Sequence, residues 1–234
     1  MRSDRLLGDV KRFYELLDLL EGTVGGKRRL AECDGRMDWP RRGVYFFFEP
    51  GEGRSRSGHG PRVVRVGTHG LKAGSKSTVW GRLRQHRGTI AGAHAGGGNH
   101  RGSIFRLHVG TALLARGDWP DEVTRTWRVG SSARREIRER EVPLEKAVSK
   151  HIGQMPFLWL DVDDSPGPQS LRGYIERNAI ALLSNGGPGS NDPGSTTWLG
   201  RWAAAGAIRS SGLWNVNHVG DRYDLAFLDV LLHR

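Results

Sequence analysis

The stretch that decides the fold is residues 43–86, GVYFFFEPGEGRSRSGHGPRVVRVGTHGLKAGSKSTVWGRLRQH. Residues 43–49 form an apolar and aromatic run, and Pro50-Gly51 follows it, which predicts a strand that ends there. A second run, residues 63–67, predicts a strand that pairs with the first as a long-looped hairpin. Residues 78–86 predict a helix, which places Arg82 and His86 four residues apart and therefore on one face.

In this order of elements, the chain resembles the GIY-YIG nuclease family. Gly43-Val44-Tyr45 stands at the position of the family's first tripeptide, and Arg65-Val66-Gly67 stands at the position of the second. Arg82 matches the family's helix arginine, and His86 matches a histidine of several branches. The chain departs from the pattern at Arg65, where the family has its second tyrosine.

The resemblance implies roles for the matching residues. Tyr45 would orient or deprotonate the attacking water, and His86 would accept the proton through Tyr45 or act as the base itself. Arg82 would hold the scissile phosphate. Arg65 cannot donate a phenol, so it would lower the pKa of Tyr45 or bind phosphate. Gly43 and Gly67 would support the site. Tyr45 also has a purely structural interpretation, because three phenylalanines follow it in the same strand.

The resemblance also implies a metal ligand on a helix after the third strand, followed by an asparagine. Glu176 meets this expectation, and we expect it to bind one Mg²⁺ or Mn²⁺. Asn185 follows as the site-supporting residue, although Asn before Gly is also a common helix C-cap, and Asn191 is a competing candidate.

The charge of the chain favours a polyanionic partner. Lys and Arg total 36 against 25 acidic residues, a formal net charge of +11, and each phosphate that a basic side chain neutralises releases counterions. A solubility surface is the alternative explanation. We expect double-stranded DNA as the partner, with contacts from a set of five basic residues: Lys76, Arg84, Arg87, His100 and Arg101.

Outside the motif, hydrophobic spacing predicts helices over residues 3–21 and 170–184 and a buried strand over residues 157–162. A charged helix over residues 133–141 is expected to stop at Pro143, which would open the next helix. Residues 104–115 fit a strand or a helix equally well. His151 lies on an apolar helix face, which favours a packing role.

These elements predict an α/β (α+β) fold with a small central mixed three-stranded sheet flanked by helices. We expect a single domain over 1–234, with an N-terminal helix and approach (1–42), a nuclease-like core (43–86 and 157–185), an insertion (88–155) and a C-terminal cap (190–234). The lone Cys33 and the acidic residues near the N-terminus favour a reducing cytoplasm. A homo-oligomer is possible but is not indicated.

The function predicted on this basis is a metal-dependent DNA endonuclease, of restriction or repair type. The alternative is a non-catalytic nucleic-acid-binding module that retains the fold, which Arg65 motivates. A third class, a nucleotide-binding loop at residues 70–77, departs from the Walker pattern at Ser75. The segments around Trp198 and Trp214 could stack on bases, but buried anchors of the C-terminal cap are the favoured interpretation.

Overall fold

The structure is a computed structural model that describes residues 2–92, 94–185 and 192–233. In chain order its helices and strands are α1 (Arg2–Val24), β1 (Arg28–Arg29), β2 (Gly43–Gly53), β3 (Pro61–Gly67), α2 (Val79–Arg87), α3 (Ile104–Arg116), α4 (Asp121–Thr126), α5 (Arg135–Gly153), β4 (Pro156–Asp161), α6 (Leu171–Leu183), α7 (Gly206–Ser211) and α8 (Ala226–Leu232). Short 3-10 turns lie at Leu30–Glu32, His100–Gly102 and Leu199–Trp202. No helix in these ranges is both long and apolar enough to span a bilayer.

The sheet confirms the α+β class and corrects two details of the expected sheet. Its strand order is β1-β4-β2-β3, and every neighbouring pair is antiparallel. The sheet thus has four strands in the described ranges, where three were expected, and it is not mixed. Strand β4 pairs with β2 and not with β3, so no parallel neighbours arise. Strand β1 has two exposed arginines and no apolar pattern, which is why the sequence did not reveal it.

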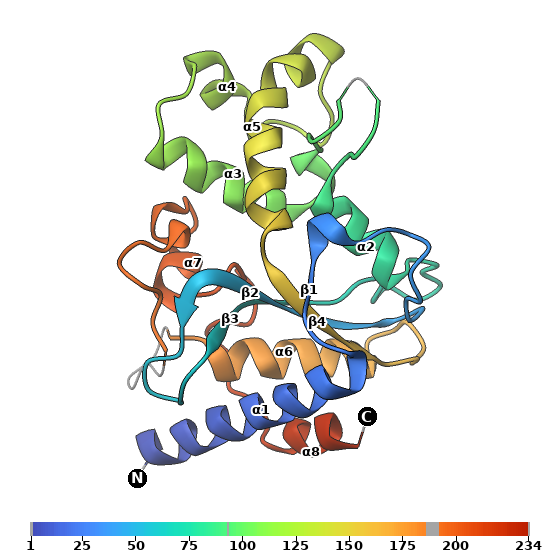
Figure 1. Ribbon diagram of the computed structural model, residues 1–234, viewed down its shortest axis with the longest axis vertical. Coiled ribbons are helices and arrows are strands. Elements are labelled where there is room, and N and C mark those ends of the chain that lie inside the picture. The colour runs from blue at the N-terminus through green and yellow to red at the C-terminus, as the bar shows by residue number, and fades with distance from the viewer. Residues whose placement is uncertain (1, 93, 186–191, 234) are drawn as a thin grey trace.

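The two faces of the sheet carry separate cores, because side chains alternate along each strand. Tyr45 and Phe47 of β2 pack in one core with residues of α2, α3 and α5. Val44, Phe46 and Phe48 pack in the other core with residues of α1, α6 and α8. Figure 1 shows this layering, with α1, α6 and α8 on one side of the sheet and the α3–α5 helices beyond the other. The aromatic run of β2 is therefore buried on both faces.

Several expected boundaries shift. Strand β2 continues through Pro50-Gly51 to Gly53, which pairs with Pro61, and register irregularities absorb the interruption. The ambiguous stretch 104–115 is a helix. Pro143 lies inside α5 and does not stop it, which corrects the expected break. The helix continues because ion pairs hold the turns beside the proline: Glu141 with Arg101, and Glu145 with Arg106.

The C-terminal segment closes the edge of the sheet beside β3. The backbone N–H of Trp214 donates to Val64 O (2.6 Å). The Asn215 side chain accepts from Val66 N–H (3.1 Å) and donates to Val66 O (2.8 Å), so one amide imitates a neighbouring strand. The indole N–H groups of Trp198 and Trp214 both donate to Glu49 Oε2. Both tryptophans are buried, which confirms that they anchor the C-terminal cap.

Candidate active site

Tyr45 and His86 are brought into contact by the packing of α2 on the sheet. Tyr45 lies in β2 opposite Gly67 on one side and Trp159 on the other. Thr78 caps α2 by accepting from Gly81 N–H (3.0 Å), and the helix directs His86 toward the same face of the sheet. Tyr45 Oη lies 2.9 Å from His86 Nε2. Both side chains are almost completely buried, so this hydrogen bond is shielded from water.

Glycines are required at the two motif positions because other groups fill the space. A Cβ at Gly67 would lie 2.6 Å from Tyr45 Oη, and one at Gly43 would collide with the backbone carbonyl of Leu160. Gly67 therefore makes room for the Tyr45 ring, and Gly43 permits the close approach of β2 to β4. These two residues support the position of Tyr45.

Arg65 occupies the position of the missing tyrosine as a buried cation. Its NH1 group donates to Trp214 O (2.7 Å), and the guanidinium lies over the Phe105 ring, 4.6 Å from the centroid. Its Nε is buried and makes no hydrogen bond within the described residues. Burial lowers the pKa of Arg65, and interaction with Tyr45 and Glu176 opposes this shift. The substitution thus replaces a phenol by a charge beside Tyr45.

Burial raises the pKa of Tyr45, so the phenol is neutral at rest. The charge of Arg65, and the charge and a hydrogen bond of Arg82, act in the opposite direction and favour the phenolate. Arg82 lies on α2 and donates through NH1 to Gln85 Oε1 (2.7 Å) and Gly102 O (3.1 Å). Burial first, and then the positive charges of Arg82, Arg65 and Arg106, hold the pKa of His86 well below its usual value. His86 is therefore a neutral imidazole.

Glu176 approaches this group from α6 through Thr68. The backbone N–H of Thr68 donates to Glu176 Oε1 (3.1 Å). The carbonyl of Thr68 accepts from Tyr45 Oη (3.4 Å), and its hydroxyl donates to Gly43 O (2.8 Å). Burial raises the pKa of Glu176, while Arg65 and the Thr68 N–H oppose the shift. Thr68 was not among the predicted residues; the only sequence signal was its place directly after the Gly67 motif.

The structure therefore gathers four predicted residues around a fifth, Tyr45, and leaves one predicted residue apart. Tyr45, Arg65, Arg82, His86 and Glu176 interact as described above. Asn185 does not contact them in the described structure. Its side-chain amide donates to Asp192 O (2.9 Å) and Ser211 O (3.1 Å), so it joins the segment at Asp192 to the end of α7. The competing candidate, Asn191, lies outside the described residues.

The five basic residues predicted to bind nucleic acid fall into two groups. Lys76 and Arg84 are exposed. Arg87 is buried, donates to the backbone carbonyl of Cys33, and lies over the Trp80 ring. His100 and Arg101 have side chains that are 1% and 4% exposed. The last three are engaged inside the protein and do not present their charge to a ligand.

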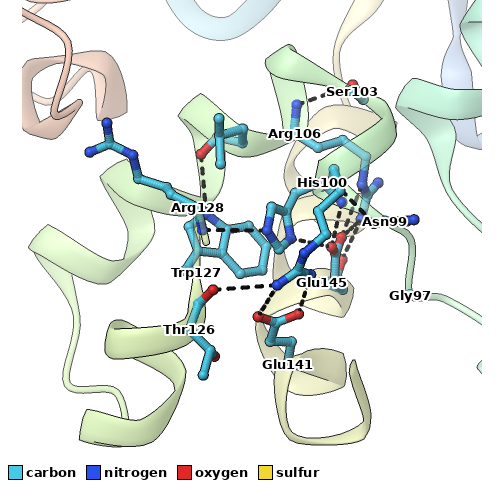
Figure 2. Close-up of polar contacts among 12 residues, drawn as sticks. Gly97, Asn99, His100, Ser103, Arg106, Thr126, Trp127, Arg128, Glu141 and Glu145 are labelled. Carbon is cyan, nitrogen blue, oxygen red and sulfur yellow. Dashed lines mark hydrogen bonds and ion pairs between the residues drawn. The ribbon is translucent and has the colours of Figure 1, made fainter. Parts of the chain in front are cut away.

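His100 and Arg101 belong to a buried polar cluster with Arg106, Glu141 and Glu145. Figure 2 shows His100, Arg106 and the two glutamates of this cluster. The His100 ring stacks on Trp127 (centroids 3.7 Å apart), and its Nδ1 lies 2.9 Å from Glu145 Oε1. Arg106 also binds Glu145, and Arg101 binds both oxygens of Glu141. These contacts fix the start of α3, which lies directly beside His86.

Other acidic and histidine candidates have structural partners. Asp164 binds Arg172, and Asp163 lies 3.7 Å from Arg42. His151 Nε2 lies 3.1 Å from Glu49 Oε1, and its ring packs edge-on against Trp214, which agrees with a packing role. Across the part of the chain that the structure describes, no three His, Cys, Asp or Glu side chains form a group suited to a metal ion.

As a single carboxylate, Glu176 suits a metal ion that retains most of its bound water. Its Oε1 accepts from Thr68, and its Oε2 makes no hydrogen bond to any described residue. A hard divalent cation such as Mg²⁺ binds well through one carboxylate oxygen, with water completing its shell. The donor set is thus compatible with Mg²⁺ or Mn²⁺ and unsuited to zinc, which takes three or four protein ligands.

Comparison with known proteins agrees with this geometry. A family model described as a GIY-YIG domain matches residues 4–234. No curated protein and no solved structure gave a significant match to the chain. The family match spans nearly the whole sequence and includes both tripeptide positions, the α2 residues and Glu176. The chain therefore belongs to the GIY-YIG family, whose domain is that of an endonuclease.

Proposed function

We propose that this chain is a metal-dependent endonuclease that hydrolyses phosphodiester bonds in double-stranded DNA. The observation that carries the proposal is the buried 2.9 Å hydrogen bond between Tyr45 Oη and His86 Nε2, beside two arginines that favour the phenolate. An aromatic residue with only a packing role would not need these charged neighbours. A net charge of +11 supports a polyanionic substrate.

In this proposal Tyr45 takes the proton from the attacking water. A phenol whose pKa is raised by burial is a strong base once it has ionised. Arg65 and Arg82 lower the cost of that ionisation, because each places a positive charge near the phenolate oxygen. The substitution at Arg65 is therefore compatible with catalysis, although the family has a tyrosine there.

Arg82 is the residue proposed to hold the scissile phosphate. Its NH1 group donates to Gln85 and Gly102, and the guanidinium also interacts with the Tyr45 phenol, so Arg82 lies beside the proposed base. A guanidinium binds two phosphate oxygens at once and stabilises the negative charge that grows on them during hydrolysis. Lys76 and Arg84 are proposed to bind neighbouring phosphates of the backbone, because both are exposed.

Glu176 is proposed to hold one Mg²⁺ or Mn²⁺ through Oε2. When bound, such an ion stabilises charge on the phosphoryl oxygens and on the departing 3′ oxygen. Burial raises the pKa of Glu176, and Arg65 and the Thr68 N–H both oppose that shift and so favour the ionised carboxylate. Asn185 is proposed to support the site from a distance by fixing the end of α6 to Asp192 and to the end of α7.

The test is cleavage of supercoiled plasmid with Mg²⁺ or Mn²⁺, using methylated and unmethylated DNA. We expect wild-type protein to nick or linearise the plasmid, and we expect EDTA or Glu176→Ala to abolish cutting while DNA binding persists. Glu139→Ala removes an exposed glutamate and serves as the control that retains activity. A dependence on sequence and methylation would indicate restriction, and a dependence on damaged DNA would indicate repair.

Two outcomes would contradict the proposal. If Glu176→Ala cut DNA at the wild-type rate, Glu176 would be excluded as the metal ligand. Salt-sensitive DNA binding without cutting, on every plasmid and with either metal, would identify the alternative function, a non-catalytic binding module that keeps the fold.

A further inference from the structure

The proposed chemistry leaves the direction of the Tyr45–His86 hydrogen bond open. Either Tyr45 donates its hydrogen to the ring, as a group that passes a proton to His86 would, or the ring donates to Tyr45. The two arrangements require different tautomers of the neutral imidazole, because the ring carries one hydrogen, on Nδ1 or on Nε2. The partner of Nδ1 decides between them.

That partner is Ser103, which the sequence did not single out. His86 Nδ1 lies 2.8 Å from Ser103 Oγ. Ser103 also caps α3, where its Oγ accepts from the backbone N–H of Arg106 (3.3 Å); Figure 2 shows this second contact. Ser103 is 1% exposed, so water does not reach its hydroxyl.

The hydroxyl hydrogen of Ser103 has one acceptor among the described residues. The Arg106 backbone N–H can only donate, so it cannot receive that hydrogen. His86 Nδ1 is the remaining atom within hydrogen-bond distance. If Nδ1 carried the ring hydrogen, it would donate to Ser103, and a buried hydroxyl would have no acceptor, which native structures avoid.

The opposite arrangement satisfies every group in turn. Ser103 donates to Nδ1 of His86, and Nε2–H of His86 donates to Tyr45 Oη. Tyr45 then donates to Thr68 O at 3.4 Å. Arg106 also fixes the backbone of His86, by donating from NH1 to its carbonyl (2.9 Å). Phe47 and Phe105 pack edge-on against the ring, and among the described residues its polar contacts are those of its two nitrogens.

We infer that Ser103 is a positioning residue that holds His86 as the Nε2–H tautomer, so that His86 serves as a hydrogen-bond donor to the Tyr45 oxygen. This inference builds on the proposed function, in which Tyr45 becomes a phenolate. A donor at Nε2 stabilises that phenolate together with Arg65 and Arg82. The phenolate of Tyr45, and not His86, is then the group that receives the water proton.

The test is the ¹⁵N spectrum of histidine-labelled protein, recorded without DNA or metal. Protonated and unprotonated ring nitrogens have widely separated shifts, and His86→Gln identifies the signals of this ring among nine histidines. We expect a protonated Nε2 and an unprotonated Nδ1. A wild-type ring protonated on Nδ1 would overturn the inference.

Variants at position 103 test the role of the hydroxyl. Ser103→Asp still caps α3 but can only accept, so Nδ1 should become protonated. Ser103→Thr keeps the hydroxyl and should leave the wild-type signals unchanged. Ser170→Ala alters the cap of a different helix, α6, and is the control that should leave the His86 signals unchanged. An unprotonated Nδ1 in folded Ser103→Asp would refute the assignment. Because no DNA is present, these outcomes do not depend on whether the protein cuts DNA.

Discussion

Replacing Glu145 by Gln should destabilise the fold far more than the same replacement of a surface glutamate would. Glu145 accepts four hydrogen bonds, from His100 N (2.6 Å), His100 Nδ1 (2.9 Å), Arg106 Nε (3.0 Å) and Arg106 NH2 (2.5 Å). Its side chain is 5% exposed, and that of Arg106 is 0% exposed. Gln has nearly the same shape but no charge, so the variant leaves the Arg106 guanidinium buried without a counterion.

The expected loss follows from that uncompensated charge. Removing one partner of a buried ion pair costs about 3–5 kcal/mol. The matched control is Glu139→Gln in the same helix, α5, where the pair with Arg135 has side chains 85% and 46% exposed. Exposed pairs contribute about 0–1 kcal/mol. Because a domain is typically stable by about 5–15 kcal/mol, the first variant should lose a large part of its folding free energy.

Urea denaturation followed by circular dichroism measures both variants. With an m value of about 2 kcal/mol/M, the midpoint of Glu145→Gln should fall by about 1.5–2.5 M, and that of Glu139→Gln by less than about 0.5 M. The double variant Glu145→Leu/Arg106→Met should be less destabilised than the sum of its single variants, because it removes both charges together.

The same carboxylate gives a direction for the pH dependence of stability. Although burial alone would raise the pKa of Glu145, hydrogen bonds from His100 and the charge of Arg106 lower it below 4.5. A group with a depressed folded-state pKa stabilises the protein above its unfolded pKa and loses this contribution as the pH falls through the folded value. Wild-type protein should therefore lose stability below about pH 4.5, and Glu145→Gln should lose less over that range.

For the denaturation experiment, equal urea midpoints for Glu145→Gln and Glu139→Gln would refute the argument that the buried Arg106 needs its counterion.

Two further predictions concern the site itself. Gly67→Ala places a methyl group against the Tyr45 ring, so we expect its free energy of unfolding, measured with urea, to fall by about 1–3 kcal/mol. The control is Gly53→Ala in the same hairpin, where no atom lies nearer than 3.7 Å and the loss should be less than about 1 kcal/mol. Similar losses for the two variants would argue against the predicted crowding. Arg84→Ala should leave the folding stability unchanged and reduce the slope of log K for duplex DNA against log salt concentration by about 0.9. Arg101→Ala, in contrast, should mainly lower the folding stability, because it breaks the buried pair with Glu141. An unchanged slope for Arg84→Ala would exclude a phosphate contact.

Much of the core and part of the site could be predicted from local pattern. The aromatic run at 43–49 and the glycines at the two motif positions, Gly43 and Gly67, predict a hairpin, because aromatic and β-branched residues favour strands. Most of the candidate site lies within residues 43–86, which contain Tyr45, Arg65, Arg82 and His86. Glu176 needed the family pattern, because a glutamate on an amphipathic helix has no distinctive local signal.

The boundaries that failed were decided by contacts distant in sequence. Pro143 breaks an isolated helix, yet α5 runs through it because the 3-10 turn before α3 supplies Arg101, and α3 supplies Arg106, as partners for its glutamates. Strand β1 exists only because β4 lies beside it. Arg87, His100 and Arg101 look like phosphate ligands in a basic sequence, but the fold turns all three inward. Net charge cannot distinguish an arginine that faces solvent from one that is buried.

By itself, the sequence determined the strand–strand–helix unit, the α+β class and the family, because alternation, helical spacing and glycine placement are local properties. Tertiary structure alone decided the four-stranded antiparallel order, the role of Thr68 as the link between Glu176 and Tyr45, and the contact of Ser103 with His86. The physical reason is that hydrogen-bond direction and pKa depend on burial and on neighbours 17 to 108 residues away, which no local pattern encodes.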